Sequence, residues 1–143
     1  TEQDVAKPFV GVVSTWNEAA PCNTAIMRQA QSVKKGVKES GGTPREFCTI
    51  TVPDGIAMGH EGLKSSLISR EIIADSAELT VRGHCYDALV GIAGCDKSLP
   101  GLMMSMLRLN VPRVFIYGGS ILTGKFKGKD VTVVDVFEAV GKH

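Results

Sequence analysis

The sequence is poor in aromatic residues, nearly neutral in charge, and free of long hydrophobic runs. Aromatic residues make up 6% of its 143 residues, and the net charge at pH 7 is +1. Proteins that bind nucleic acid usually present a clustered basic face, and those that bind single strands also use aromatic stacking. A membrane span needs about 20 consecutive apolar residues, and no stretch reaches that length. We therefore expect neither nucleic acid nor a membrane as a partner.

The four cysteines are irregularly spaced, and none of them forms a C-x-x-C motif. Disulfide frameworks are typical of small secreted chains, whereas a chain of this length can build a core. The first residues show neither a secretory nor a transit pattern. We therefore expect a reducing compartment, namely the cytoplasm or, in a plant or fungus, an organelle matrix, with some cysteines acting as ligands. A thiol redox module is the weakest alternative, because it would be expected to carry C-x-x-C.

Strand-like and helix-like segments alternate along the chain. Helical spacing of apolar residues follows each of the first three apolar, strand-like segments. This alternation predicts a three-layer α/β sandwich, in which helices cover both faces of a largely parallel sheet. We expect one domain over 1–143, with strands at 9–15, 47–52, 88–94 and 114–117, and a further strand or an approach to a helix at 131–134.

Cap and turn residues indicate where the helices begin and end. Asn23 is expected to cap the first long helix, which Gly41-Gly42 would end. The second is expected to begin near residues 65–66 and to carry its apolar residues on one face, opposite outward charges. The expected apolar residues of that face are Ile68, Ile72 and Leu79. We expect the third helix to place four apolar residues in the core, namely Leu102, Met103, Met106 and Leu109. The two cysteines without a predicted ligand role, Cys48 and Cys85, are also expected in the core.

Groups able to bind metals follow three of the predicted strands. Cys95-Asp96-Lys97 comes directly after the third strand, Cys22 follows the first, and Asp54 follows the second. The carboxyl ends of parallel strands share one edge of a sheet, so these side chains can converge there. Thiolates suit an iron–sulfur cluster and carboxylates suit Mg²⁺. Two cysteines do not complete a four-thiolate cluster, which leaves a ligand missing or an iron open.

Each of these residues also has an ordinary structural interpretation. A cysteine at a strand end is commonly a small buried hydrophobe. Asp54, between Pro and Gly, suits a simple turn. Lys97 could be a solvated lysine at a helix terminus or the ion-pair partner of Asp96. The case for a site depends on the three loops together.

Four separated motifs resemble those of the dihydroxy-acid dehydratases, which form a superfamily with the 6-phosphogluconate and sugar-acid dehydratases. The resemblance runs over nearly the whole chain, and the Asp-Gly pair in the second motif is typical of the dihydroxy-acid branch. The motifs are NEAAPCN at 17–23, PDGIAMGHEG at 53–62, SREIIADS at 69–76 and GCDKSLPG at 94–101.

The resemblance implies a site with two kinds of metal centre. Cys22 and Cys95 would bind a [2Fe–2S] cluster, and Asp54, Asp96 and Lys97 would bind Mg²⁺. Lys97 would do so as a carbamate formed with CO₂, because an ammonium has no lone pair to offer. The implied activity is that of a hydro-lyase. These residues alone would not complete its active site, since the base and the third cluster cysteine would lie beyond residue 143.

The resemblance also implies a reaction and a larger protein. The reaction is dehydration of a 2,3-dihydroxy acid to the 2-keto acid in branched-chain amino-acid biosynthesis, the route to isoleucine and valine. The chain would be the N-terminal part of a homodimeric enzyme, inactive without a second, β-rich domain. In that case the sheet edge with the site should expose apolar side chains.

Two other functions stay open at this point. One is a sugar-acid dehydratase of the same superfamily. The other is a non-catalytic nucleotide- or phosphate-binding domain that uses Gly118-Gly119-Ser120, although no G-x-G-x-x-G or Walker loop is present. His60 and Glu61 lie close to the predicted site, but a structural hydrogen bond and a helix cap explain them equally well. A simple turn is the preferred interpretation of Ser120.

Overall fold

A parallel four-stranded sheet forms the centre of the computed structural model, which describes residues 1–142. The strands are β1 (Phe9–Ser14), β2 (Thr43–Cys48), β3 (Ala88–Ala93) and β4 (Arg113–Tyr117). Their order across the sheet is β2-β1-β3-β4, and every pairing is parallel. The predicted α/β class is therefore confirmed.

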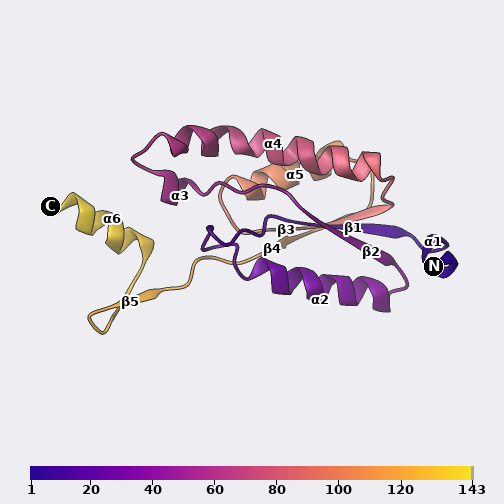
Figure 1. The fold of residues 1–143 in the computed structure, drawn as a ribbon, viewed down its shortest axis with the longest axis horizontal. Helices are drawn as coiled ribbons and strands as arrows, with labels where there is room; N and C mark the ends of the chain where they lie inside the picture. The colour runs from indigo at the N-terminus through magenta and orange to yellow at the C-terminus, as the bar shows by residue number, and fades with distance from the viewer. Residues whose placement is uncertain (143) are drawn as a thin grey trace.

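Helices cover both faces of the sheet and complete the three layers (Figure 1). Helix α2 (Ile26–Glu39) lies on one face, and α4 (Gly62–Gly83) and α5 (Ser98–Arg108) lie together on the other. The short helices are α1 (Glu2–Val5) and α3 (Asp54–Ala57). Beyond β4, a hairpin of β5 (Gly124–Phe126) and β6 (Lys129–Val131) leads to α6 (Val133–Gly141), which lies away from the sheet.

Alternate residues of the central strands fill two hydrophobic clusters. Val13 of β1 packs into the cluster under α4 and α5, whereas the preceding Val12 packs against Ile26 and Ala30 of α2. Both faces of the strand are thus buried, which explains why β1 and β3 are almost continuously apolar in sequence. The core fixes the sheet between its two helical layers.

The strand order reverses direction between β1 and β3. From β1 the chain moves through α2 to β2 on one side, then crosses through α4 to β3 on the other side. The loops that follow β1 and β3 therefore leave the sheet toward opposite faces. In open α/β sheets, this reversal opens a crevice at the carboxyl ends of the two strands, where ligands bind.

The predicted second strand was wrong in position. It was expected at 47–52, but β2 begins at Thr43, and residues 49–53 continue as an irregular segment. Pro44 made the early part of β2 look unlike a strand. Within the described chain β2 pairs with β1 alone, and a proline is tolerated on such an edge strand because its missing N–H faces outward.

Two predicted helix starts were also wrong. Helix α2 begins at Ile26 after Ala25, and Asn23 is fully buried instead of capping it. Helix α4 begins at Gly62, a few residues before the predicted 65–66. The region predicted as a strand or helix approach at 131–134 contains the end of β6 and the first residues of α6.

The predicted inner face of α4 is its outer face. Ile68, Ile72 and Leu79 are exposed, and the helix instead buries small residues together with Ile73 and Val81. The reason is the close approach of α5. A Cβ on Gly101 of α5 would lie 2.8 Å from Ile73 Cγ2 and 2.9 Å from the Arg70 carbonyl oxygen, so small residues are needed at this contact.

Three further core predictions were wrong, and the rest are confirmed. Leu102, Met106 and Leu109 are buried, but Met103 is exposed on the outer side of α5. Cys48 is exposed because it ends the edge strand β2, and Cys85 is exposed in the turn before β3, where its φ is 52°.

Replacing Gly101 with alanine should destabilise the protein. The added methyl group would overpack the α4–α5 contact, and overpacking costs about 1–3 kcal/mol. Gly36→Ala in α2 is the matched control, because a Cβ there would meet no described atom within 4 Å. That change should stabilise the helix by about 0.5–1 kcal/mol. Denaturant unfolding measures both. A Gly101→Ala protein as stable as Gly36→Ala would contradict the close packing.

Candidate functional site

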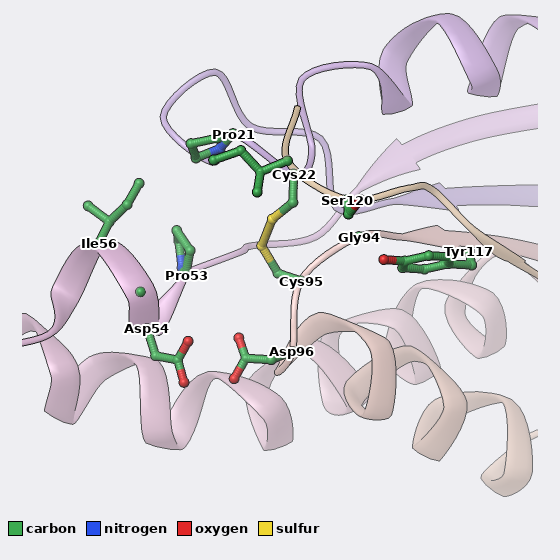
Figure 2. Close-up of a pocket in the computed structure, with 12 residues that line it drawn as sticks. Pro21, Cys22, Pro53, Asp54, Ile56, Gly94, Cys95, Asp96, Tyr117 and Ser120 are labelled. Atoms are coloured by element: carbon green, nitrogen blue, oxygen red, sulfur yellow. A yellow bond between two sulfur atoms is a disulfide. The ribbon is translucent and has the colours of Figure 1, made fainter. Parts of the chain in front are cut away.

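The loops after β1, β2, β3 and β4 enclose a pocket at the carboxyl edge of the sheet (Figure 2). Its volume is about 230 Å³. The pocket contains four of the five predicted site residues, and the fifth, Lys97, contacts two of them. The residues that line it are Pro21, Cys22, Pro53, Asp54, Gly55, Ile56, Gly94, Cys95, Asp96, Tyr117, Ser120 and Ile121.

The two predicted cluster cysteines meet in this pocket. Cys22 and Cys95 are joined in a disulfide across 73 residues of sequence, and their Cα atoms are 6.1 Å apart. The sequence predicted two converging thiol ligands and did not anticipate a bond between them. The disulfide forms because the two loops bring the Cβ atoms within bridging range. The same convergence is what two thiolate ligands of one cluster require.

Asp54, Asp96 and Lys97 form an ion-paired group beside the cysteines. The Lys97 ammonium lies 3.2 Å from Asp54 Oδ2 and 2.5 Å from Asp96 Oδ2. Figure 2 shows the two carboxylates directed toward one another. All three side chains are partly exposed. A single cation thus lies between two carboxylates that the chain brings from separate loops.

Local hydrogen bonds hold the loops that carry these groups. The Ser98 hydroxyl accepts a hydrogen bond from the Cys95 N–H and donates one to the Cys95 carbonyl, each at 3.1 Å, which closes the turn that contains Asp96 and Lys97. On the other side, the Ser66 hydroxyl of α4 donates to the Val52 carbonyl at 2.8 Å. This contact fixes the irregular segment just before Asp54, the first residue of α3.

The charges in this group stabilise one another. The pKa of Asp54 lies below its ordinary value, chiefly because of its hydrogen-bond contact with Asp96 and then because Lys97 faces it. The pKa of Lys97 is raised, chiefly by its hydrogen bond with Asp96 and then by Asp54. Lys97 therefore stays protonated at neutral pH and offsets one of the two carboxylate charges.

The residues fit a divalent cation in part. Two carboxylates are suitable ligands for Mg²⁺, and the Lys97 ammonium already marks a cationic position between them. Among residues 1–142, no group of three His, Cys, Asp or Glu side chains is arranged to hold a metal ion. A third protein ligand would have to come from a modified Lys97 or from outside the described residues.

The remaining predicted neighbours have structural explanations. His60 uses both ring nitrogens locally, with Nδ1 accepting from the Gly62 N–H at 3.0 Å and Nε2 lying 3.2 Å from the Ile56 carbonyl oxygen. Glu61 forms an exposed ion pair with Lys64. Ser120 does line the pocket.

Sequence reasoning gave no role to Tyr117, although it lines the pocket. As the last residue of β4, it lies at the same sheet edge as the other site residues, so the strand-end rule that identified them could have identified it. Ile56 and Ile121 were also missed. They line the pocket with exposed side chains, and Met58 and Leu122 nearby are exposed as well. Exposed apolar residues at this edge agree with the prediction made from the sequence.

The fold and this pocket agree with a comparison to known families. Residues 7–143 match the family described as dihydroxy-acid/6-phosphogluconate dehydratase N-terminal. The chain belongs to this dehydratase family, which confirms the resemblance seen in the four motifs.

Particular relatives are closely similar in sequence. The dihydroxy-acid dehydratases of Pelagibacter ubique (strain HTCC1062) and Parvibaculum lavamentivorans are 89% and 80% identical to this chain over 143 residues. The dihydroxy-acid dehydratase of Metallosphaera sedula is 56% identical over 141 residues. These alignments cover 99–100% of this chain but 25% of each relative, so the chain spans about a quarter of their length. No helix in residues 1–142 is long and apolar enough to cross a membrane.

Lys97→Met should raise the pKa of Asp54 above its value in the unmodified protein. The substitution leaves two carboxylates facing each other without a cation, which disfavours their ionised forms. Carboxyl-carbon NMR titration measures the change. Lys64→Met is the control, because Lys64 pairs with the exposed Glu61 outside the pocket. An unchanged pKa of Asp54 in Lys97→Met would contradict the described geometry.

The same variant should respond differently to acid. A carboxyl whose pKa is lowered in the folded state adds stability above its ordinary pKa, and this stability is lost as the pH falls through the lowered value. Lys97→Met lacks the part of that contribution that Lys97 supplies, so it should lose less stability than the unmodified protein on acidification.

Proposed function

We propose that this chain supplies the cluster and magnesium ligands of a hydro-lyase active site that dehydrates a 2,3-dihydroxy carboxylic acid to the 2-keto acid. One observation carries the proposal: a cysteine pair and a carboxylate pair, delivered by different strand ends, line the same pocket. Soft thiolates and hard carboxylates select different metals. A pocket that contains both pairs therefore suits a reaction that uses two kinds of metal centre.

Cys22 and Cys95 would hold the [2Fe–2S] cluster as thiolates, once their disulfide is reduced. Asp54 and Asp96 would hold Mg²⁺. When bound, these groups would supply Lewis acidity, the iron toward the departing 3-hydroxyl and the magnesium toward the carboxylate and 2-hydroxyl. With two thiolates from this chain, the ligand set is short of four, which agrees with an iron that must remain accessible. We assign the base that removes the C2 proton to a residue outside this chain.

Lys97 would complete the magnesium site as a carbamate. Its Nζ attacks CO₂, an N–C bond forms, and a proton is released, so that a cation becomes an anionic oxygen ligand. The attack requires the neutral amine, but Asp54 and Asp96 raise the pKa of Lys97 and keep it protonated. Lys97 loses that stabilisation when the two carboxylates bind a divalent cation instead. Cation binding and carbamate formation should therefore favour one another.

The walls of the pocket favour an aliphatic substrate over a sugar acid. Pro21, Pro53, Ile56 and Ile121 make one part of the lining apolar. An alkyl side chain would be compatible with this wall, whereas the hydroxyls of a sugar acid would lose water there without finding partners. This supports the dihydroxy-acid reaction, and with it a place in isoleucine and valine biosynthesis. The homodimer and the cytoplasmic location stay predictions.

The other candidate functions gain less support. In the loop after β4, the Gly118 N–H donates to the Ala93 carbonyl at 2.7 Å, so this N–H is not free to bind phosphate. The disulfide alone would suit a thiol redox module. Such a module would give no role to Asp54, Asp96 and Lys97, which lie beside it.

Cys95→Ser in the full-length enzyme should abolish binding of the cluster and with it the activity. The serine hydroxyl is a poor ligand for iron, and Cys22 alone cannot hold the cluster from this chain. Iron and acid-labile sulfide analysis, together with the visible spectrum, measures the loss. Cys48→Ser is the matched control, since Cys48 is exposed outside the pocket, and it should keep full iron content. Equal iron content in both variants would contradict the assignment of Cys95.

Asp54→Asn should weaken magnesium binding while leaving the cluster in place. The amide keeps the shape of the side chain but loses its charge. We expect the Mg²⁺ concentration needed for half-maximal activity to rise. Loss of a residue that hydrogen-bonds a metal ligand typically weakens metal binding by about 10–100-fold, and loss of the ligand itself should have at least that effect. Asp130→Asn, in the exposed β5–β6 hairpin, is the control. A variant with unchanged magnesium dependence would remove Asp54 from the site.

A further inference from the structure

A buried asparagine ties the loop that carries Cys22 to the end of β1. Asn23 is fully buried, and its Nδ2 donates to the Thr15 carbonyl at 2.7 Å and contacts Thr15 Oγ1 at 3.2 Å. Thr15 is itself fixed, because its N–H donates to the Ile92 carbonyl of β3 at 3.2 Å. The residue after Cys22 is thus connected, through two short contacts, to the strand that precedes Cys95.

The other side of the same contact is Gly94, the residue before Cys95. A Cβ at this position would lie 2.5 Å from Asn23 Oδ1 and closer still to the carbonyl oxygen of Cys22. Any larger residue would therefore push the Cys22 loop away from the end of β3. Gly94 allows the two cysteine backbones to approach, and Asn23 holds them there.

The orientation of the Asn23 amide adds a second observation. Its nitrogen must face the Thr15 carbonyl, so its oxygen faces Gly94, where Oδ1 is buried without a hydrogen-bond partner in the described chain. A buried oxygen left without a partner is unfavourable. This unfavourable burial of Oδ1 occurs where the two cysteine loops meet, which indicates that the spacing of the loops matters.

We propose that Asn23 and Gly94 are positioning residues, which set the separation of the Cys22 and Cys95 sulfurs before any cofactor binds. The consequence for a cluster rests on the proposed function, but the spacing of the thiols can be tested without one. Rigid positioning raises the effective concentration of one thiol toward the other, and small misplacements lower it strongly.

The test uses the full-length protein without its cofactor, equilibrated with glutathione and glutathione disulfide. Two thiols are oxidised to the Cys22–Cys95 disulfide while one glutathione disulfide is reduced to two glutathiones, so the reaction balances. Alkylation followed by mass spectrometry of the two cysteine peptides gives the equilibrium constant. We expect Asn23→Ala and Gly94→Ala to lower it about tenfold or more. Asn110→Ala, an exposed asparagine between α5 and β4, should leave it unchanged.

Folding is measured on the same samples by circular dichroism and denaturant unfolding. Thr15→Val, which removes only the longer contact of the Asn23 amide and preserves the side-chain shape, serves if a larger change prevents folding, and it should lower the constant less. An unchanged constant in folded Asn23 and Gly94 variants, with reduced stability alone, would show a merely structural role and overturn the proposal.

A second readout separates this inference from the proposed function. In protein loaded with iron and sulfide, the folded variants should show lower cluster content and an altered electron paramagnetic resonance signal after reduction. If the unmodified protein binds no cluster while the thiol equilibrium still depends on Asn23 and Gly94, the proposed function fails and the positioning role stands. If the cluster binds equally well in all variants and the equilibrium does not change, the positioning role fails alone.

Discussion

The pairing of β1 with β3 is the constraint on which the rest of the structure depends. It places the loop with Cys22 beside the turn with Cys95, although 73 residues separate the two cysteines. Because the chain adds β2 on one side and β4 on the other, the crevice opens between the two central strands. The pocket is a direct consequence of strand order, and the identities of its residues determine which chemistry it can perform.

Charge is the second organising feature of the site. Two carboxylates at the mouth of a partly apolar pocket repel one another unless a cation lies between them. In this chain Lys97 fills that role, and it belongs to the same turn as one of the carboxylates. One cation thus offsets part of the charge of the carboxylate pair, and the same residue would have to change its charge for a metal to bind between the carboxylates.

The sequence predicts the interior strands of the sheet and the residues of the site better than it predicts the edge strand β2 and the buried face of α4. β1 and β3 lie within a residue of their expected bounds, since burial on both faces makes them continuously apolar. β4 is also within a residue of its expected bounds, although it is an edge strand, because its run from Val114 to Tyr117 is apolar and aromatic. β2 was misplaced because Pro44 is acceptable only at an edge, and edge position is a property of the whole sheet. The buried face of α4 consists largely of serine and alanine, so hydrophobic periodicity favoured the wrong face.

Asn23 is of a residue type that commonly caps helices, so the sequence alone predicts a cap. Only its three-dimensional surroundings show that it joins two loops. The meeting of Cys22 with Cys95, by contrast, follows from the strand-end rule.

The central place of β1 also has a consequence for the order of assembly during synthesis. β1 leaves the ribosome before the other three strands of this sheet, and β2 can pair with one of its edges soon afterwards. Its other edge has no partner until residues 88–93 have emerged, so the nascent chain carries an open, apolar strand through the synthesis of α4. Unpaired strand edges of this kind promote association between chains. The nascent protein is consequently most vulnerable to aggregation just before the two halves of its own binding site come together.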